Sequence, residues 1–368
     1  KVVNERPDFK KEITKRNGTI SANNDADYGV GDMLPYTLTI KVPQGIGSMK
    51  TFAVTDTITP TQLEYQKDVV VTGTDKNGTA ITSDNYKVTY ADDGGSFTVD
   101  FKPQNQTDLT EAFADQTITI KYTAKLLSGA AITSAGNVNK AELVYSNKTS
   151  VTGEETPDDK NTIHDEGVIY TFRTAIKKTD PDGMALDGVS FVLYKKYDET
   201  DGTIDEQTST ILFNGETCNV ITGNAAKKYG LAAESKWIEV KSDKTANQGN
   251  IMASGIPCGE YYWVETETLN GYNLLKDPVK ADLTIAYKAT WKTSTEYVNN
   301  VMTKHQFDKT ENYDDTAMAT PITIVNRKGF TLPVTGGFGT LLFSGIGVLL
   351  VLAGVCVLFS MKKKNNRA

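Results

Sequence analysis

The chain has few of the side chains that most metal and catalytic sites use. It contains only two histidines and three cysteines, and His164 and His305 stand apart from each other and from any cysteine cluster. Metal sites need several such ligands at short, regular spacings. Phosphate-binding loops and nucleophile–base pairs are also absent from the sequence. These absences argue against a metal centre, a bound cofactor and an enzyme with turnover.

A basic surface and an apolar leader are missing as well. Acidic residues outnumber basic ones by 46 to 39, which gives a net charge of −7 and a pI near 5.1. Nucleic-acid binding requires a basic face, so no nucleic-acid partner is expected. The chain does not open with the charged, apolar and small-residue segments of an export signal. We therefore expect a mature form, or a fragment that begins inside a longer precursor.

Long helical patterns are scarce, and short alternating segments dominate. Residues 36–42, 117–122 and 190–194 alternate between apolar and polar side chains with a period of two. Turn pairs lie between such runs: Asn17-Gly18, Asn77-Gly78, Gly94-Gly95 and Asn214-Gly215. Many short strands with regular turn signals are typical of immunoglobulin-like β-sandwiches. A polar, acidic stretch at 153–160 predicts a boundary, with one domain at 1–167 and a second at 168–328.

The tail has three parts in a fixed order. The pentapeptide Leu332, Pro333, Val334, Thr335, Gly336 lies in a linker at 329–337; an uncharged apolar run follows at 338–361, and a basic end at 362–368. About 20 apolar residues suffice to cross a bilayer as a helix, and the basic end stays on the cytoplasmic side. The tail resembles the cell-wall sorting signal of Gram-positive surface proteins. That resemblance implies that sortase cleaves between Thr335 and Gly336 and passes the threonine carbonyl to an amine. The alternative is an ordinary single-span anchor after an accidental pentapeptide.

The three cysteines divide between the tail and the exterior. Cys356 lies in the apolar run and is expected to be an inert hydrophobic residue. Cys218 and Cys258 precede the anchor, where an oxidising exterior permits a disulfide between them. Two free thiols are the alternative.

The second domain resembles the B-type repeat domain of collagen adhesins, which also builds Gram-positive pilins. The similarity lies in 176–183 with 186–191, in 259–266 with Gly271 and Tyr272, which looks like the pilin E-box, and in the last strand at 322–326. Two positions depart from the family pattern: Val189 replaces an alanine, and Thr268-Leu269 replaces Ala-Pro. In this family a lysine and an asparagine side chain join in an isopeptide bond.

The chemistry of such a bond follows from burial. A lysine amine attacks only when it is neutral, and apolar burial lowers its pKa. A buried acid can then shuttle protons while contact distance supplies a high effective molarity. Lys178 shares the inward face of its strand with Phe172 and Ile176. We predict Lys178 as nucleophile, Asn326 as electrophile and Glu265 as proton shuttle, with Lys177 as the alternative nucleophile.

The first domain resembles the A-type-like domain that precedes the B-type domain in backbone pilins. The similar segments are 27–36, 54–58, 120–124 and 136–147. Phe9, Lys11 and Ile13 alternate on one face, so Lys11 is predicted to point inward and Lys10 outward. We predict a second bond from Lys11 to Asn139, with Asp56 as the acid. Asn137 has the same inward parity and remains an alternative; a turn-capping role is the alternative for Asp56.

The resemblance also implies a polymerisation site. Backbone pilins carry a lysine a few residues before this domain that accepts the sorted threonine of the next subunit, and Lys1 stands at a comparable distance from Pro7. A surface lysine is the alternative for Lys1. The expected function is a structural, shaft-forming pilin on the cell wall, with sortase, other pilin subunits and peptidoglycan as partners. The alternative is a monomeric wall-anchored adhesin that binds host matrix or cell receptors.

Overall fold

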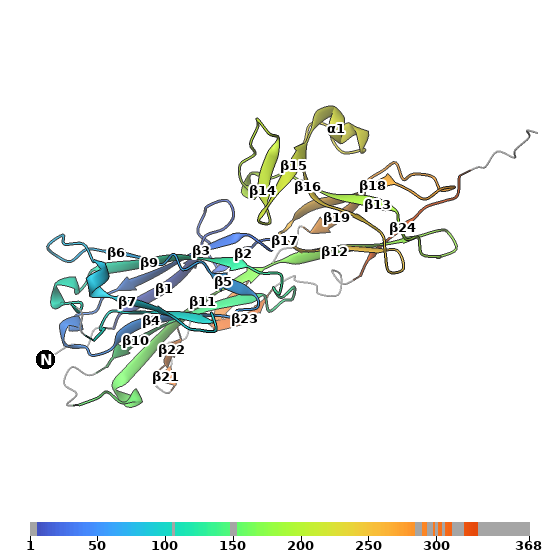
Figure 1. The fold of residues 1–368 in the computed structure, drawn as a ribbon. Helices are drawn as coiled ribbons and strands as arrows, with labels where there is room; N and C mark the ends of the chain where they lie inside the picture. The colour runs from blue at the N-terminus through green and yellow to red at the C-terminus, as the bar shows by residue number, and fades with distance from the viewer. Residues whose placement is uncertain are drawn as a thin grey trace, which may run out of the picture.

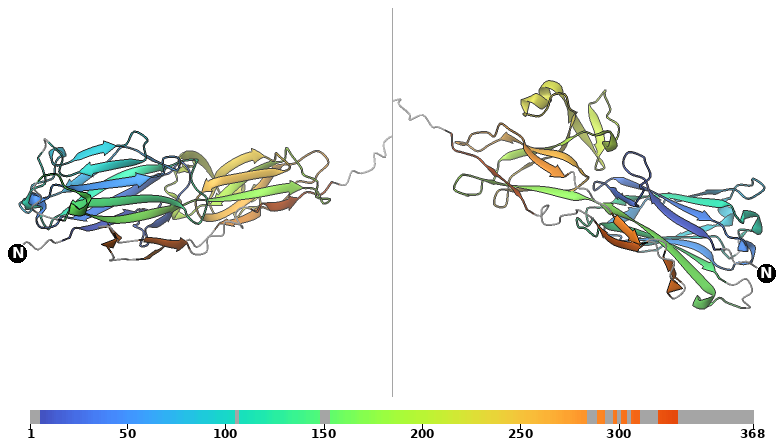
Figure 2. Two further views of the ribbon diagram at one scale, coloured as in Figure 1. Left: turned by 90° about the horizontal axis from the view of Figure 1, so that it is seen from below. Right: turned by 180° about the vertical axis from the view of Figure 1, so that it is seen from behind.

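The computed structural model describes residues 6–104, 107–147, 153–283, 289–292, 297–298, 301–303, 306–310 and 320–329. Almost all of its regular structure is β, arranged as two strand-rich bodies along one axis (Figures 1 and 2). The mainly β fold predicted from period-two alternation is confirmed. The predicted strands at 36–42, 117–122 and 190–194 lie within, or within one residue of, β3, β9 and β13.

The first body contains the N-terminal strands. They are β1 (Asp8–Ile13), β2 (Asp25–Asp27), β3 (Met33–Lys41), β4 (Phe52–Ile58), β5 (Leu63–Tyr65), β6 (Val70–Gly73), β7 (Lys87–Tyr90), β8 (Ser96–Asp100), β9 (Thr117–Leu126), β10 (Asn137–Ser146) and β11 (Lys160–Tyr170). One sheet has the order β1-β3-β9-β5, with β6 also on β9; the other contains β11-β10-β4-β8-β7, with β2 on β11. Short 3₁₀ turns are η1 (Ile46–Ser48), η2 (Ser83–Asn85), η3 (Glu111–Phe113) and η4 (Pro157–Asp159). Inward residues of both sheets form a single apolar core.

The second body follows directly. It consists of β12 (Phe172–Thr179), β13 (Ser190–Lys196), η5 (Glu199–Asp201), β14 (Thr210–Phe213), β15 (Glu216–Ile221), α1 (Gly223–Lys228), β16 (Trp237–Lys244), β17 (Asn250–Ile256), β18 (Gly259–Glu267), β19 (Val279–Leu283) and β24 (Ile322–Val325). Its sheets are β17-β12-β24 and β14-β15-β16-β13-β18-β19. β24 pairs in parallel with β12, so the two ends of the domain lie side by side.

The junction between the two bodies is a nearly continuous strand. β11 ends at Tyr170 and β12 begins at Phe172. Ile169 packs in the first core, whereas Val168 and Tyr170 pack in the second. The predicted division between residues 167 and 168 therefore falls inside β11, and it stays a prediction.

A segment assigned by sequence to the second domain joins the first instead. β21 (Tyr297–Val298) and β22 (Val301–Thr303) pair with each other, and β22 extends the eight-stranded sheet beside β11. β20 (Ala289–Lys292) and β23 (Gln306–Thr310) form a separate two-stranded sheet. Alternation shows that a segment is a strand but does not identify the sheet edge that it joins.

Within the described ranges, no helix combines the length and the apolar character needed to span a bilayer. The predicted span at 338–361 and the basic end at 362–368 lie outside those ranges.

Candidate functional site

A fully buried lysine stands at the centre of the first domain. Along β1, Phe9, Lys11 and Ile13 are buried, while the Lys10 side chain is about half exposed. Each strand residue points to the face opposite its neighbours, so a single alternation places Lys11 inside. A buried ammonium needs a partner, because an isolated charge in an apolar interior is very costly.

Asp56 is that partner. It lies on β4, and its Oδ2 is 2.5 Å from Lys11 Nζ. Tyr122 donates to the same Oδ2 at 2.6 Å, and Tyr65 donates to Oδ1 at 2.8 Å. Asp56 is thus held by three side chains inside the core, on a strand and not in the turn that the capping alternative requires.

Asn139 reaches the same centre from β10. Its Nδ2 lies 3.1 Å from the Tyr122 hydroxyl oxygen, which also accepts from Lys11 Nζ at 2.6 Å. Its Oδ1 is buried and has no hydrogen-bond partner among the described residues. Asn137 is engaged elsewhere: its amide bonds to the backbone of Ala131 and Ile169. The geometry therefore brings together Lys11, Asp56 and Asn139, here called the first centre.

Burial determines the proton affinities in the first centre. Loss of solvent lowers the pKa of Lys11, although the Asp56 charge acts in the opposite direction. Burial and the nearby Asp56 carboxylate raise the pKa of Tyr122 well above its usual value. The amine is therefore easier to deprotonate than an exposed lysine, and the Tyr122 hydroxyl keeps its proton.

A second buried lysine occupies the second domain. Lys178 on β12 is fully buried, whereas Lys177 is partly exposed. Lys178 Nζ donates to the Ile324 carbonyl at 3.2 Å and lies 3.8 Å from Glu265 Oε2. Burial lowers the pKa of Lys178 to about 8, with Glu265 opposing the shift.

Asn326 completes this second centre (Lys178, Glu265, Asn326). It follows β24, and its Nδ2 donates to Glu265 Oε1 at 2.5 Å and to Thr268 Oγ1 at 2.8 Å. Glu265 Oε2 is buried without a hydrogen-bond partner in the described part of the chain. Glu265 Oε2 lies near the Lys178 amine, and Glu265 Oε1 accepts from the Asn326 amide. The Glu265 carboxyl group therefore contacts both groups that would react.

The two centres connect different parts of their sandwiches. In the first, Lys11 and Asn139 belong to different sheets. In the second, Lys178 and Asn326 belong to neighbouring parallel segments of one sheet, and Glu265 comes from the other. Asn139 does not lie on the last strand of its domain, because β11 follows β10 and pairs with it. A Lys11–Asn139 bond would therefore join β1 to β10 and leave β11 outside the closed loop.

Sequence reasoning missed Tyr122, Tyr65 and the role of Thr268. A signal for Tyr122 was present, because it shares the inward parity of Ile118 and Ile120 on β9. Thr268 is a loop residue noticed only as a departure from Ala-Pro. Thr268 directly follows β18, and its hydroxyl reaches Asn326 only because the chain after β18 lies beside the end of β24.

The predicted disulfide is corrected by the structure. Cys218 and Cys258 are not joined in the described part of the chain. Cys218 lies on β15 in a cluster with Ile211 and Ile238, and burial raises the pKa of its thiol to about 11. Cys258 follows β17 and packs against a different core. The two thiols pack against different apolar clusters, which spacing along the chain does not reveal.

The other predicted sites fall outside the described residues. These are Lys1 and the sorting residues Leu332, Pro333, Val334, Thr335 and Gly336. The last described segment ends at residue 329, and Asn326 within it precedes Thr335 by nine positions (335 − 326) in the sequence.

The fold and the two centres define a class: tandem β-sandwich domains, each with lysine, acid and asparagine buried together. A family model, the SpaA prealbumin-like fold domain, matches residues 173–299. Over 395 aligned residues the chain is 23% identical to the trypsin-resistant surface T6 protein of Streptococcus pyogenes serotype M6, covering 97% of this chain and 69% of that protein.

Solved structures share the fold of this chain. The T6 backbone pilin of S. pyogenes serotype M6 is similar with a TM-score of 0.53 and 17% identity, over 88% of this chain and 71% of that one. The 35 kDa C-terminal fragment of the major pilin GBS80 of Streptococcus agalactiae gives 0.51 and 17%, over 88% and 100%. The chain thus shares the fold of Gram-positive major pilins, and the predicted resemblance is confirmed.

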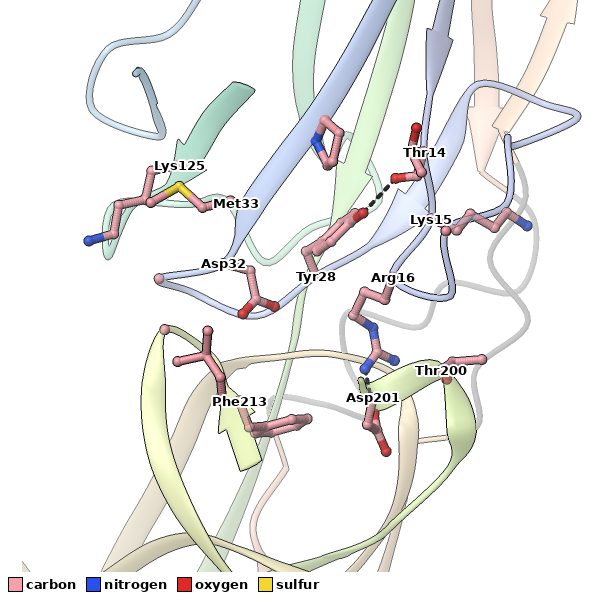
Figure 3. A pocket seen from close by; sticks show the side chains of 15 residues that line it. Thr14, Lys15, Arg16, Tyr28, Asp32, Met33, Lys125, Thr200, Asp201 and Phe213 are labelled. Carbon is pink, nitrogen blue, oxygen red and sulfur yellow. Dashed lines mark hydrogen bonds and ion pairs between the residues drawn. The ribbon is translucent and has the colours of Figure 1, made fainter. Parts of the chain in front are cut away.

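A buried charge network joins the two domains beside a pocket of about 460 Å³. Arg16 donates to Asp201 at 2.5 Å and forms an ion pair with Asp27 at 3.2 Å; Lys195 donates to the other Asp201 oxygen at 2.5 Å. Figure 3 shows Arg16 reaching from the first domain to Asp201 in the second, with Phe213 on the second-domain side. The Arg16–Asp201 contact connects residues 185 positions apart along the chain.

Close backbone contact reinforces this junction. Val30 N donates to Gly255 O at 2.7 Å. Gly31 has φ +97°, and a Cβ there would lie 2.4 Å from the Asn214 carbonyl oxygen. The predicted Asn214-Gly215 turn has positive φ at both residues and is confirmed as the β14–β15 turn that meets Gly31.

Replacing Arg16 with alanine should loosen the junction. The change leaves buried Asp201 with Lys195 as its remaining cation, so the loss should be smaller than the about 3–5 kcal/mol that follows when a buried charge is left with no partner. The spread of distances between spin labels on the two domains should widen, and the unfolding midpoint should fall. Lys236→Ala is the control, because the Lys236–Glu206 pair is exposed and worth about 0–1 kcal/mol. An unchanged distance distribution in Arg16→Ala would mean that backbone contacts alone fix the domains.

Proposed function

We propose that this chain is a shaft subunit of a covalent pilus on a Gram-positive cell surface, and that each sandwich domain is closed by one Lys–Asn isopeptide bond. The observation that carries the proposal is the pair of buried lysine–acid–asparagine centres. Each domain buries a lysine together with the acid and the asparagine that the crosslinking reaction needs. Isolated buried charges are rare because they are costly, so finding the full set twice favours a chemical role. The shared pilin fold supports the same reading.

The reaction in each centre follows from the contacts. The lysine gives one proton to the acid, and neutral Nζ attacks Cγ of the asparagine. The Nζ–Cγ bond forms as the amide carbonyl opens to a tetrahedral intermediate, while the acid holds the proton it took from the lysine. The former amine then releases a second proton, the leaving Nδ2 takes one up, and the Cγ–Nδ2 bond breaks to release ammonia. Each bond forms once and without turnover, so the chemistry is self-modification of a structural protein.

Assembly uses the segments at the two ends. Sortase would cleave between Thr335 and Gly336 and transfer the threonine carbonyl to an amine of the next pilin subunit, for which Lys1 is the candidate, or to peptidoglycan. The apolar run at 338–361 would hold the chain in the membrane until that transfer. Localisation at the cell wall follows from this route.

Mass spectrometry of the full recombinant chain tests the crosslinks. Each bond releases one ammonia, so two bonds lower the intact mass by about 34 Da. Digestion should yield two branched peptides, one joining Lys11 to Asn139 and one joining Lys178 to Asn326. A chain with the unmodified mass would contradict the proposal. Lys10→Ala is a matched control that removes an outward neighbour and should keep both branched peptides.

Blots of wall extracts test assembly independently. A shaft pilin should give a ladder of high-mass species that disappears in Thr335→Ala. A single band in cells that express sortase would instead favour the monomeric adhesin.

A further inference from the structure

The two centres differ in how the acid reaches the amide. In the second centre Glu265 Oε1 accepts directly from Asn326 Nδ2. In the first centre, which lies wholly within the described residues, no hydrogen bond joins Asp56 to Asn139. The Tyr122 hydroxyl lies between them: it accepts from Asn139 Nδ2 at 3.1 Å and donates to Asp56 Oδ2 at 2.6 Å. It also accepts from Lys11 Nζ at 2.6 Å.

We propose that Tyr122 is a catalytic residue of the first centre, and that its hydroxyl relays a proton to the leaving amide nitrogen of Asn139. This inference rests on the Lys11–Asn139 crosslink proposed above. The relay solves a geometric problem, because Asp56 can take a proton from Lys11 directly but has no direct contact through which to deliver one to Nδ2. No such relay is required in the second centre.

The relay balances as follows. Lys11 first gives one proton to Asp56 and then attacks Asn139 Cγ, so Nζ becomes bonded to carbon and still carries a proton to lose. Asp56 passes its proton to the Tyr122 oxygen while the Tyr122 proton moves to Nδ2, and Asp56 recovers a proton from Nζ. The Cγ–Nδ2 bond then breaks and ammonia leaves. The tyrosine and the Asp56 carboxyl group end in the protonation state in which they began the attack.

The surroundings of Tyr122 hold its hydroxyl in place. Its ring is stacked on Tyr36 at 5.3 Å between centroids and meets Phe97 edge-on at 4.9 Å. Tyr122 lies opposite Tyr36 in the β3–β9 pairing. A ring fixed on both sides cannot swing its hydroxyl away from the three groups. Because burial raises the Tyr122 pKa, the hydroxyl remains protonated and works by accepting and donating together.

Tyr65 provides a matched contrast inside the same core. Its hydroxyl donates to Asp56 Oδ1 at 2.8 Å and has no contact with Lys11 or Asn139 among the described hydrogen bonds. Tyr65→Phe therefore removes a hydrogen bond to the acid and leaves the relay intact. Tyr122→Phe removes the relay and conserves the ring. Both variants delete one buried hydroxyl, so they have similar consequences for packing.

The test follows both crosslinks over time in the full chain. Cell-free synthesis is quenched at intervals, and digestion gives the fraction of each branched peptide. Tyr122→Phe should slow formation of the Lys11–Asn139 peptide on the order of 10²-fold, the lower end of the usual effect of a proton-transfer group. The Lys178–Asn326 peptide of the same molecules should form at the wild-type rate. Tyr65→Phe should slow the first crosslink only a few-fold.

A second measurement uses the unmodified protein and so does not depend on how a variant folds. In deuterated water the first crosslink should slow more than the second, because its proton passes through an additional transfer. Equal isotope effects, a wild-type rate in Tyr122→Phe, or equal slowing by Tyr65→Phe would each overturn the relay while leaving the crosslinks in place. A wild-type chain without the Lys11–Asn139 peptide would overturn both the relay and the proposed first crosslink.

Discussion

Asp56→Asn is expected to leave the first domain folded but uncrosslinked. Digestion should release Lys11 and Asn139 in separate linear peptides, while the Lys178–Asn326 peptide forms completely. The substitution conserves shape and removes the charge that keeps Lys11 protonated. The amine therefore becomes more often neutral, yet the group that shuttles protons is gone. Loss of a shuttle slows such a step by about 10²–10⁴-fold.

The same variant should also be less stable. A bond from Lys11 to Asn139 closes a loop of roughly 130 residues, and the loop-entropy model assigns such a crosslink about 5 kcal/mol. We therefore expect the first domain to unfold at a temperature lower by about 10–20 °C, at about 2–4 °C per kcal/mol for a domain of this size.

Asp165→Asn is the control for Asp56→Asn. Asp165 is also buried and near Lys11, but its Oδ2 accepts from the Lys11 backbone nitrogen at 2.9 Å and not from the amine. The control should therefore keep its crosslink. If Asp56→Asn formed the bond at the wild-type rate, burial of the amine alone would suffice and the proton-shuttle role of Asp56 would be wrong.

The sequence predicted those features of the sites that depend on the alternation of side chains within a single strand. Alternation placed Lys11 and Lys178 inward and Lys10 outward, because neighbouring strand residues must face opposite sides. Alternation could not choose between Asn137 and Asn139, because both side chains point inward. The choice depends on where β10 passes Tyr122 on the other sheet, and no local pattern encodes that distance.

The parts that sequence could not predict depend on pairing between distant segments. Tyr122 meets Asp56 because β9 and β4 face each other across the core. Thr268 meets Asn326 because the loop after β18 closes over the end of β24. The position of β22 beside β11 and the packing of Cys218 and Cys258 against different clusters have the same origin. Each requires the sheet order, which alternation leaves open.

The position of Asn139 on β10 determines how tension would cross the chain. From Lys11 a covalent path would pass to Asn139, along β10, back along β11 and into β12 as far as Lys178, and then across to Asn326. The β10–β11 pair therefore remains inside the path. It is antiparallel from Asn137 opposite Ile169 to Ser146 opposite Lys160, so tension acts on its hydrogen bonds directly.

Pulling single full chains from both ends should reveal this segment. The wild type should lengthen in one step of at most about 130 Å, because only roughly 40 residues between Asn139 and Lys178 lie outside both bridges. The Asp56→Asn, Glu265→Gln double variant should release about 1,000 Å, since everything from Lys11 to Asn326 can unfold. Each single variant is the matched control and should release an intermediate length. A wild type that extends as far as the double variant would contradict covalent closure of both domains, because tension would then pass through hydrogen-bonded strands alone.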